Sequence, residues 1–138
     1  MSRKDIRVAL VGLGWMGQAH SRSLIRIPTL FADRKFNPIL KVCADADENR
    51  GRQAVNDFGY ERSTTDWKSA VTADDVDAVW VCAPNMLHIP IIEQACKAGK
   101  IVFSEKPIGG KPSQTLEAFN FATQNKTFTG VEIGRAHV

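Results

Sequence analysis

A glycine-rich segment near the beginning of the chain has the residue types and the spacing of a phosphate-binding turn. The segment VALVGLGWMG, which starts at Val8, runs from an apolar stretch directly into the pattern G-x-G-x-x-G. Its glycines permit a tight turn, a close approach of backbone to a pyrophosphate, and close packing of the next helix on the strand. An ordinary glycine-rich turn is the alternative, but the predicted strand before it and helix after it favour a dinucleotide site. The predicted contacts are Gly12, Gly14, Trp15, Met16 and Gly17.

A carboxylate stands where an adenosine ribose is recognised in such sites. Asp45 follows the second predicted strand, and it can accept hydrogen bonds from the ribose hydroxyls while its charge repels a 2′-phosphate. It lies further from Gly17 than the usual spacing of about 20 residues, which we attribute to an insertion over 30–38. Asp45 favours NAD, and NADP stays an alternative because Arg50 can offset the repulsion. A second interpretation is that Asp45 caps the helix that starts at Asp47.

Polar residues also follow the predicted strand 77–83, at the edge of the sheet where open α/β folds bind their ligands. Pro84, Asn85 and His88 come directly after this strand and are candidate cofactor contacts. Two alternatives stay open at this point. Asn85 can equally cap the following helix, and His88 can equally be an exposed residue in its first turn.

An abrupt change to charged residues follows the predicted strand 101–104. Glu105, Lys106 and Pro107 come next and fall on the same edge of the sheet. An ammonium close to a nicotinamide ring and a substrate hydroxyl can orient the hydroxyl and exchange a proton with it. Lys106 is therefore the candidate catalytic residue, with Glu105 beside it in the cofactor site. Taken alone, the two charges are more typical of a solvated ion pair.

The elements that must position these residues follow from the hydrophobic pattern. Short β-branched runs alternate with longer amphipathic ones, which is typical of a parallel sheet with helices on both faces. Strands are predicted at 6–11, 40–44, 77–83, 101–104 and 127–131, and helices at 16–27, 47–58, 67–71, 88–98 and 112–125. Residues 30–38, between Pro28 and Pro38, predict a surface loop, and 63–66 a polar link. The predicted fold class is α/β, a Rossmann-like, doubly wound, mainly parallel sheet.

The composition is that of one globular domain. The chain has 138 residues, of which 43% are hydrophobic and 24% charged, and a net charge of +3 from 18 basic and 15 acidic side chains spread along it. Because no basic stripe or long apolar run is present, we expect no nucleic acid or membrane partner. The cysteines Cys43, Cys82 and Cys96 lack metal-ligand spacing and lie in apolar runs. We therefore expect no metal site, reduced thiols and a cytoplasmic location.

Together these segments resemble the Gfo/Idh/MocA family of oxidoreductases. The resemblance runs from about Arg7 to Val131 and rests on four segments in the family's order, of which the last is the most specific. These are GLGWMGQAH at 12–20, Asp45, PNMLH at 84–88 and AGKIVFSEKP at 98–107. By this resemblance the glycines and Asp45 hold the dinucleotide, Asn85 and His88 lie near the nicotinamide ribose, and Glu105 and Lys106 flank the ring.

The resemblance also implies a reaction and a missing part. Family members transfer hydride between a secondary alcohol, of a sugar, polyol or related metabolite, and the nicotinamide of NAD(P). They continue with a second α/β domain that supplies substrate contacts and usually the oligomer interface, so this chain is expected to be inactive alone and its parent a homo-oligomer. The alternatives are a non-catalytic NAD(P)-binding or redox-sensing module with the same fold, and a methyltransferase. The lysine in EKP favours the enzyme, and the full glycine spacing disfavours the methyltransferase.

The last seven residues carry a different signature. EIGRAHV, residues 132–138, resembles the translation of an adapter ligated to DNA fragments for short-read sequencing. We therefore predict a dinucleotide-binding domain over residues 1–131, followed by a non-native tail over 132–138 that belongs to no site. A native tail is the alternative.

Overall fold

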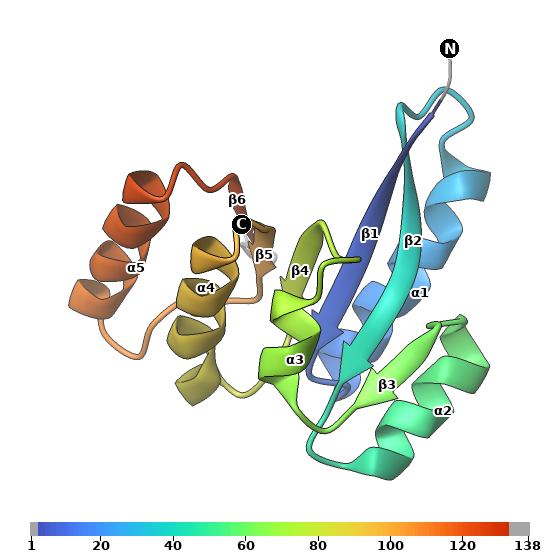
Figure 1. Ribbon diagram of the computed structural model, residues 1–138, viewed down its shortest axis with the longest axis horizontal. Coiled ribbons are helices and arrows are strands. Elements are labelled where there is room, and N and C mark those ends of the chain that lie inside the picture. The colour runs from blue at the N-terminus through green and yellow to red at the C-terminus, as the bar shows by residue number, and fades with distance from the viewer. Residues whose placement is uncertain (1–2, 133–138) are drawn as a thin grey trace, which may run out of the picture.

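The computed structural model describes residues 3–132, which form a six-stranded parallel sheet in the order β3-β2-β1-β4-β5-β6 (Figure 1). The elements are β1 (Lys4–Val11), α1 (Trp15–Leu30), β2 (Phe36–Ala44), α2 (Glu48–Phe58), β3 (Arg62–Thr64), α3 (Trp67–Thr72), β4 (Ala78–Val81), the 3₁₀ turn η1 (Asn85–Leu87), α4 (His88–Lys97), β5 (Ile101–Ser104), α5 (Pro112–Gln124) and β6 (Thr129–Val131). The two halves of the sheet wind outward from β1 and β4, so the predicted doubly wound fold is confirmed.

Helices cover both faces of this sheet, because its central strand is apolar on both sides. In β1, Val8 and Leu10 pack toward α1 and α2, while Ala9 and Val11 pack toward α3, α4 and α5. All four side chains are at most 3% exposed. A continuous apolar run is expected of a parallel strand buried on both faces, and it places the end of β1 in the middle of the fold.

The predicted loop over 30–38 is present but shorter, at residues 31–35. Helix α1 continues through Pro28 to Leu30, and β2 begins at Phe36, before Pro38. Pro28 stands in the last turn, where its missing N–H removes one helical hydrogen bond and the helix ends soon afterwards. Pro38 pairs with Ile6 of β1, while β3 pairs with β2 only from Val42 onward. Proline is tolerated there because this part of β2 is an edge. The long spacing before Asp45 therefore reflects a longer helix and a longer strand.

One strand of the sheet was not predicted from the sequence. β3 overlaps the predicted polar link at 63–64, and its three residues pair with Val42, Cys43 and Ala44 of β2. Other boundaries agree more closely: β5 has its predicted limits, and Gly59 ends α2 with a φ of 80°. Two of the cysteines, Cys43 and Cys96, are buried as predicted, while Cys82 is only partly buried.

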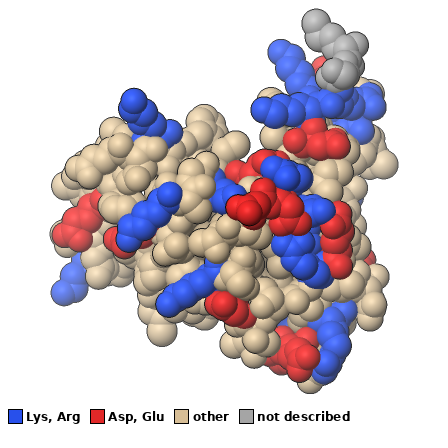
Figure 2. All heavy atoms as spheres, in the orientation of Figure 1, with Lys and Arg blue, Asp and Glu red and all other residues tan. Residues whose placement is uncertain are grey.

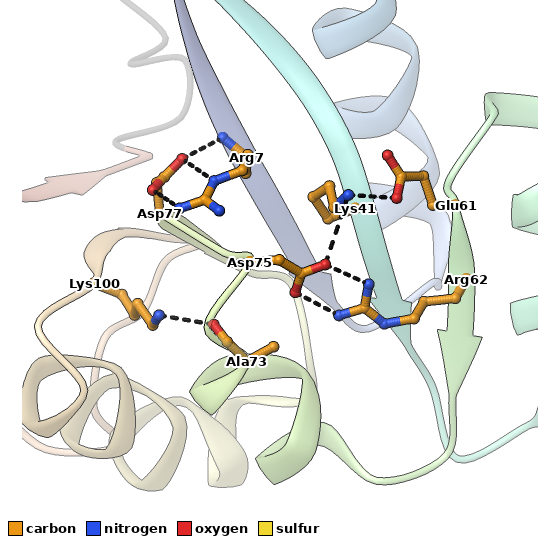
Figure 3. A network of polar contacts seen from close by, with 8 residues as sticks. All are labelled: Arg7, Lys41, Glu61, Arg62, Ala73, Asp75, Asp77 and Lys100. Atoms are coloured by element: carbon orange, nitrogen blue, oxygen red, sulfur yellow. Dashed lines mark hydrogen bonds and ion pairs between the residues drawn. The ribbon is translucent and has the colours of Figure 1, made fainter.

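A network of ion pairs ties strands together away from the carboxyl edge of the sheet (Figure 3). The Arg7 guanidinium donates to both carboxylate oxygens of Asp77, at 2.7 and 2.9 Å, and joins the middle of β1 to the segment before β4. Arg62 binds Asp75 in the same two-pronged way, at 2.7 and 2.8 Å, and Lys41 contacts Asp75 at 3.6 Å. Because such bidentate pairs are geometrically specific, they fix the spacing of the strands that carry the site.

This network predicts a loss of stability in acid. The hydrogen bonds from Arg7 lower the pKa of Asp77 from its ordinary value of 3.8 to about 2. A lowered pKa means that the pair stabilises the fold above about pH 4 and that this contribution disappears as the pH falls toward 2. We expect Asp77→Asn to lower the melting temperature by about 3 °C at pH 7 and to flatten its dependence on pH below 4.

Thermal melts between pH 7 and pH 2 would measure this effect. The exposed neighbour Asp74 provides the matched control, since Asp74→Asn removes the same charge from the same segment. Equal slopes for Asp77→Asn and the unsubstituted chain below pH 4 would contradict the assignment.

Candidate dinucleotide-binding site

The glycine turn between β1 and α1 is built so that two of its glycines are required by the protein itself. Gly12 has a φ of 96°, and a Cβ there would lie 2.5 Å from the backbone of Cys82 and Ala83. A Cβ on Gly17 would lie 1.8 Å from the carbonyl oxygen of Gly12. These contacts account for the tight turn and for the close packing of α1 on the sheet.

Gly14 is different, because a Cβ there would have no atom of the chain within 4 Å. Helix α1 begins directly after it at Trp15, with no side chain capping its N-terminus and no acidic residue in its first turn. The first N–H groups of a helix have no intrahelical partner, and their positive dipole end favours an anion. The open space over Gly14 is therefore suited to a phosphate, as the sequence predicted.

Asp45 lies at the end of β2 and holds the glycine turn. Its carboxylate accepts a hydrogen bond from the backbone N–H of Leu13 at 2.7 Å and another from that of Asp47 at 2.9 Å. The N-cap of α2 is Asp47, whose side chain accepts from the N–H of Asn49. The helix-cap interpretation of Asp45 is therefore wrong.

Two adjoining cavities form one cleft along the carboxyl ends of β1, β2, β4 and β5. The first, the Asp45 pocket, has a volume of about 570 Å³ and includes Asp45, Arg50, Thr65 and Trp67. The second, the Lys106 pocket, has a volume of about 710 Å³. Its distinctive polar lining is Asn85, His88, Glu105, Lys106 and Glu132. Both cavities are lined by Trp15, Met16, Cys82 and Ala83.

The structure brings the predicted site residues together along this cleft. Every one of them lines one of the two pockets except Gly17, which lies beneath the turn against Gly12. Sequence reasoning missed Thr65 and Trp67, since β3 and the link after it carry no motif. It also excluded Glu132, which lines the Lys106 pocket and whose backbone N–H donates to the Ser104 oxygen at 2.9 Å. Residues 133–138 lie outside the described residues, and the non-native tail stays a prediction.

The residues after β4 reach toward the segment after β5. The side-chain amide of Asn85 donates to the Pro107 oxygen at 2.7 Å, and α4 has Leu87 at its N-cap. His88 is 1% exposed. Its Nδ1 lies 2.8 Å from the Pro107 oxygen and its Nε2 lies 2.7 Å from the Ala83 oxygen. Neither the helix-cap interpretation of Asn85 nor the exposed interpretation of His88 is correct.

The two charges after β5 do not form the solvated ion pair that was the alternative. Glu105 is 6% exposed, and its Oε1 lies 2.7 Å from Nε2 of His20 in α1. Lys106 is exposed at the wall of its pocket, and no hydrogen bond or ion pair to its ammonium occurs within residues 3–132. A buried carboxylate with its own partner thus stands beside an ammonium that faces the cleft.

Comparison with known proteins settles the family. The sequence model of the Gfo/Idh/MocA family, described as an oxidoreductase family with an NAD-binding Rossmann fold, matches residues 6–133. The chain belongs to this family. The resemblance that the motifs carried is therefore confirmed.

Among its relatives in the family are sugar and polyol dehydrogenases. Levoglucosan dehydrogenase of Pseudarthrobacter phenanthrenivorans is 37% identical over 82% of this chain and 30% of its own length. Myo-inositol 2-dehydrogenase of Thermotoga maritima is 31% identical over 75% of this chain and 28% of its own. A structure of levoglucosan dehydrogenase with NADH and levoglucosan superposes with a TM-score of 0.88 at 31% identity, over 93% of this chain and 35% of that one. The chain thus spans about a third of the length of these relatives.

Neither a membrane-spanning helix nor a metal-binding group is found among the described residues. No helix within residues 3–132 has the length and apolar character to cross a membrane. Over the same residues, no group of histidine, cysteine, aspartate and glutamate side chains is arranged to hold a metal ion. On the face shown in Figure 2, basic and acidic side chains are interspersed rather than gathered into one basic surface. The absence of a nucleic acid partner stays a prediction.

Proposed function

We propose that the chain binds NAD along this cleft, with the adenosine in the Asp45 pocket, the pyrophosphate over Gly14 and the nicotinamide in the Lys106 pocket. The observation that carries the proposal is that the two pockets share four lining residues, two of which form the N-terminus of α1. A dinucleotide needs an anion site between two larger pockets, and the bare backbone at Gly14 provides it. The NADH complex of levoglucosan dehydrogenase, which has the same fold, supports this arrangement.

The charges around Asp45 favour NAD over NADP. The backbone N–H of Leu13 holds the carboxylate at the edge of the pocket, where a 2′-phosphate would meet its charge. Arg50 also lines the pocket, but its Nε lies 3.7 Å from the carboxylate of Asp47. The guanidinium that could balance a 2′-phosphate therefore has an acidic partner of its own.

In the whole protein, we propose that Lys106 acts on the substrate of a dehydrogenase. Bound NAD supplies the acceptor for a hydride from the carbon of a secondary alcohol, on a sugar, polyol or related metabolite. Lys106 faces the cleft, and in its neutral amine form it would accept the proton of that hydroxyl as the hydride leaves the carbon; in the reverse direction its ammonium would return the proton to the oxygen. By the family resemblance, we expect the remaining substrate contacts and the interface of a homo-oligomer outside the third of the relatives' length that this chain spans. Free cysteines favour a cytoplasmic location.

The test of this function starts from the source DNA, because the chain spans about a third of the length of its relatives. The source DNA would be read past the codon for Val131, and the protein it encodes assayed with NAD⁺ and a panel of sugars and polyols. We expect turnover with at least one secondary alcohol. We also expect Lys106→Ala to lower kcat by about 10²–10⁴-fold and to lower NADH affinity by only about tenfold. Tight NADH binding by the longer protein without any turnover would instead favour the redox-sensing module.

A further inference from the structure

Two histidines lie under the two ends of the short segment that carries Lys106. His20 belongs to α1 and contacts Glu105, while His88 opens α4 and contacts Pro107. Their exposure is low, at 14% for the His20 side chain and 1% for His88, whereas Lys106 between the two contacts is exposed. The segment 105–107 is therefore anchored on either side of an unanchored lysine.

The first anchor is a buried carboxylate with one donor. Glu105 Oε1 accepts from His20 Nε2 at 2.7 Å, and a buried carboxylate that lost this partner would carry a large desolvation cost. The ring of His20 also meets the edge of Phe103, with centroids 5.5 Å apart and planes at 67°. Because Phe103 belongs to β5, the ring is held against the strand that leads into Glu105. Helix α1 thereby fixes the start of the segment.

The second anchor joins the loops after β4 and β5. The buried ring of His88 lies between the carbonyl oxygens of Ala83 and Pro107, at 2.7 and 2.8 Å. Asn85 donates to the same Pro107 oxygen at 2.7 Å. Since carbonyl oxygens only accept, a ring nitrogen that carries hydrogen donates to the oxygen it faces. The end of the segment is thereby tied to the loop after β4.

A lysine side chain that has no hydrogen-bond or ion-pair partner rotates about four flexible torsions. The position of its ammonium then depends on the position of its own backbone. We propose that His20 and His88 are positioning residues that fix segment 105–107 and thereby hold Lys106 at the nicotinamide end of the cleft. This inference rests on the proposed function, and it gives His88 a role through Lys106 in place of a direct contact with the cofactor.

Two ligands separate this role from a general effect on the fold. ADP-ribose has the adenosine, the pyrophosphate and the second ribose of NADH but lacks the nicotinamide, so it reports on every part of the site except the contact with the nicotinamide ring. Dissociation constants for both ligands would be measured by calorimetry for the 138-residue chain, for His88→Gln and for His20→Gln. We expect each variant to lose about tenfold in NADH affinity and less than about twofold in ADP-ribose affinity. Ser23→Ala, an exposed change on α1, is the control and should alter neither.

A double-mutant cycle with Lys106→Ala tests whether His88 affects NADH binding through Lys106. If His88 acts by placing Lys106, then Lys106→Ala lowers NADH affinity in the original chain and has almost no further effect in His88→Gln. Additive losses, or an equal loss of both ligands, would overturn the proposal. If His88→Gln does not fold, as judged by its thermal melt, His20→Gln and Asn85→Ala enter the same cycle. Failure of the original chain to bind either ligand would instead refute the proposed function.

Discussion

Gly17→Ala is expected to lower the free energy of unfolding by about 2 kcal/mol, which is within the range observed for overpacked sites. The added Cβ would lie 1.8 Å from the Gly12 oxygen, a backbone atom that cannot rotate away. Helix α1 would have to move off the sheet, and the greater helix propensity of alanine offsets at most about 1 kcal/mol. Urea unfolding of Gly17→Ala beside the original chain would measure the difference.

Gly14→Ala is the matched control, because it adds the same methyl group to the same turn. Its Cβ would have no atom of the chain within 4 Å, so we expect the free energy of unfolding to change by less than about 0.5 kcal/mol. NADH affinity, however, should fall by about 100-fold, since the methyl group occupies the space that the pyrophosphate needs. If Gly14→Ala were as stable as the original chain and bound NADH equally well, the pyrophosphate would have to lie elsewhere.

The second large effect concerns the choice of cofactor. Asp45→Asn keeps a side-chain oxygen for the N–H of Leu13 and removes the charge. Hydrogen bonds to charged groups contribute about 1.5–3 kcal/mol, so NADH affinity should fall by about 10- to 100-fold. NADPH affinity should rise, because its 2′-phosphate no longer meets a carboxylate. The ratio of the two dissociation constants is the quantity to measure.

Asp47→Asn provides the comparison for Asp45→Asn. It removes a carboxylate two residues away, and asparagine is as good a helix cap as aspartate. We expect the ratio of NADH to NADPH affinity to move less in this variant than in Asp45→Asn. A larger shift from Asp47→Asn would mean that Arg50, freed from its partner, governs the choice.

The sequence predicted which residues line the cleft better than it predicted the contacts among them. The glycine turn could be predicted because its glycines are required by local geometry. The strand β5 could be predicted because it is short, apolar and bounded by polar residues. The strand β3 was missed, since its three residues are polar and their pairing with β2 is a tertiary contact. The start of β2 was missed for a similar reason. Pro38 is tolerated in this strand only because the strand edge beside it is unpaired, which is a tertiary feature.

The partner of Glu105 could not be read from the sequence either. Its carboxylate pairs with His20, 85 residues earlier in the chain, rather than with the adjacent Lys106. The alternative interpretation of His88 as an exposed residue rested on its place in the first turn of a helix, yet the loop after β5 covers it. Such pairings depend on the strand order, which brings α1, β4 and β5 to one edge of the sheet. A sequence motif identifies the residues at that edge but does not show which of their side chains are in contact.

The most direct test of the central claim is a fluorescence titration of the 138-residue chain with NADH. Trp15 and Trp67 line the cleft, so bound NADH should quench their emission by energy transfer. We expect saturable binding of one NADH per chain, displaced by ADP-ribose. A chain that melts cooperatively and shows neither quenching nor displacement at millimolar NADH would contradict the assignment of this cleft as a dinucleotide site.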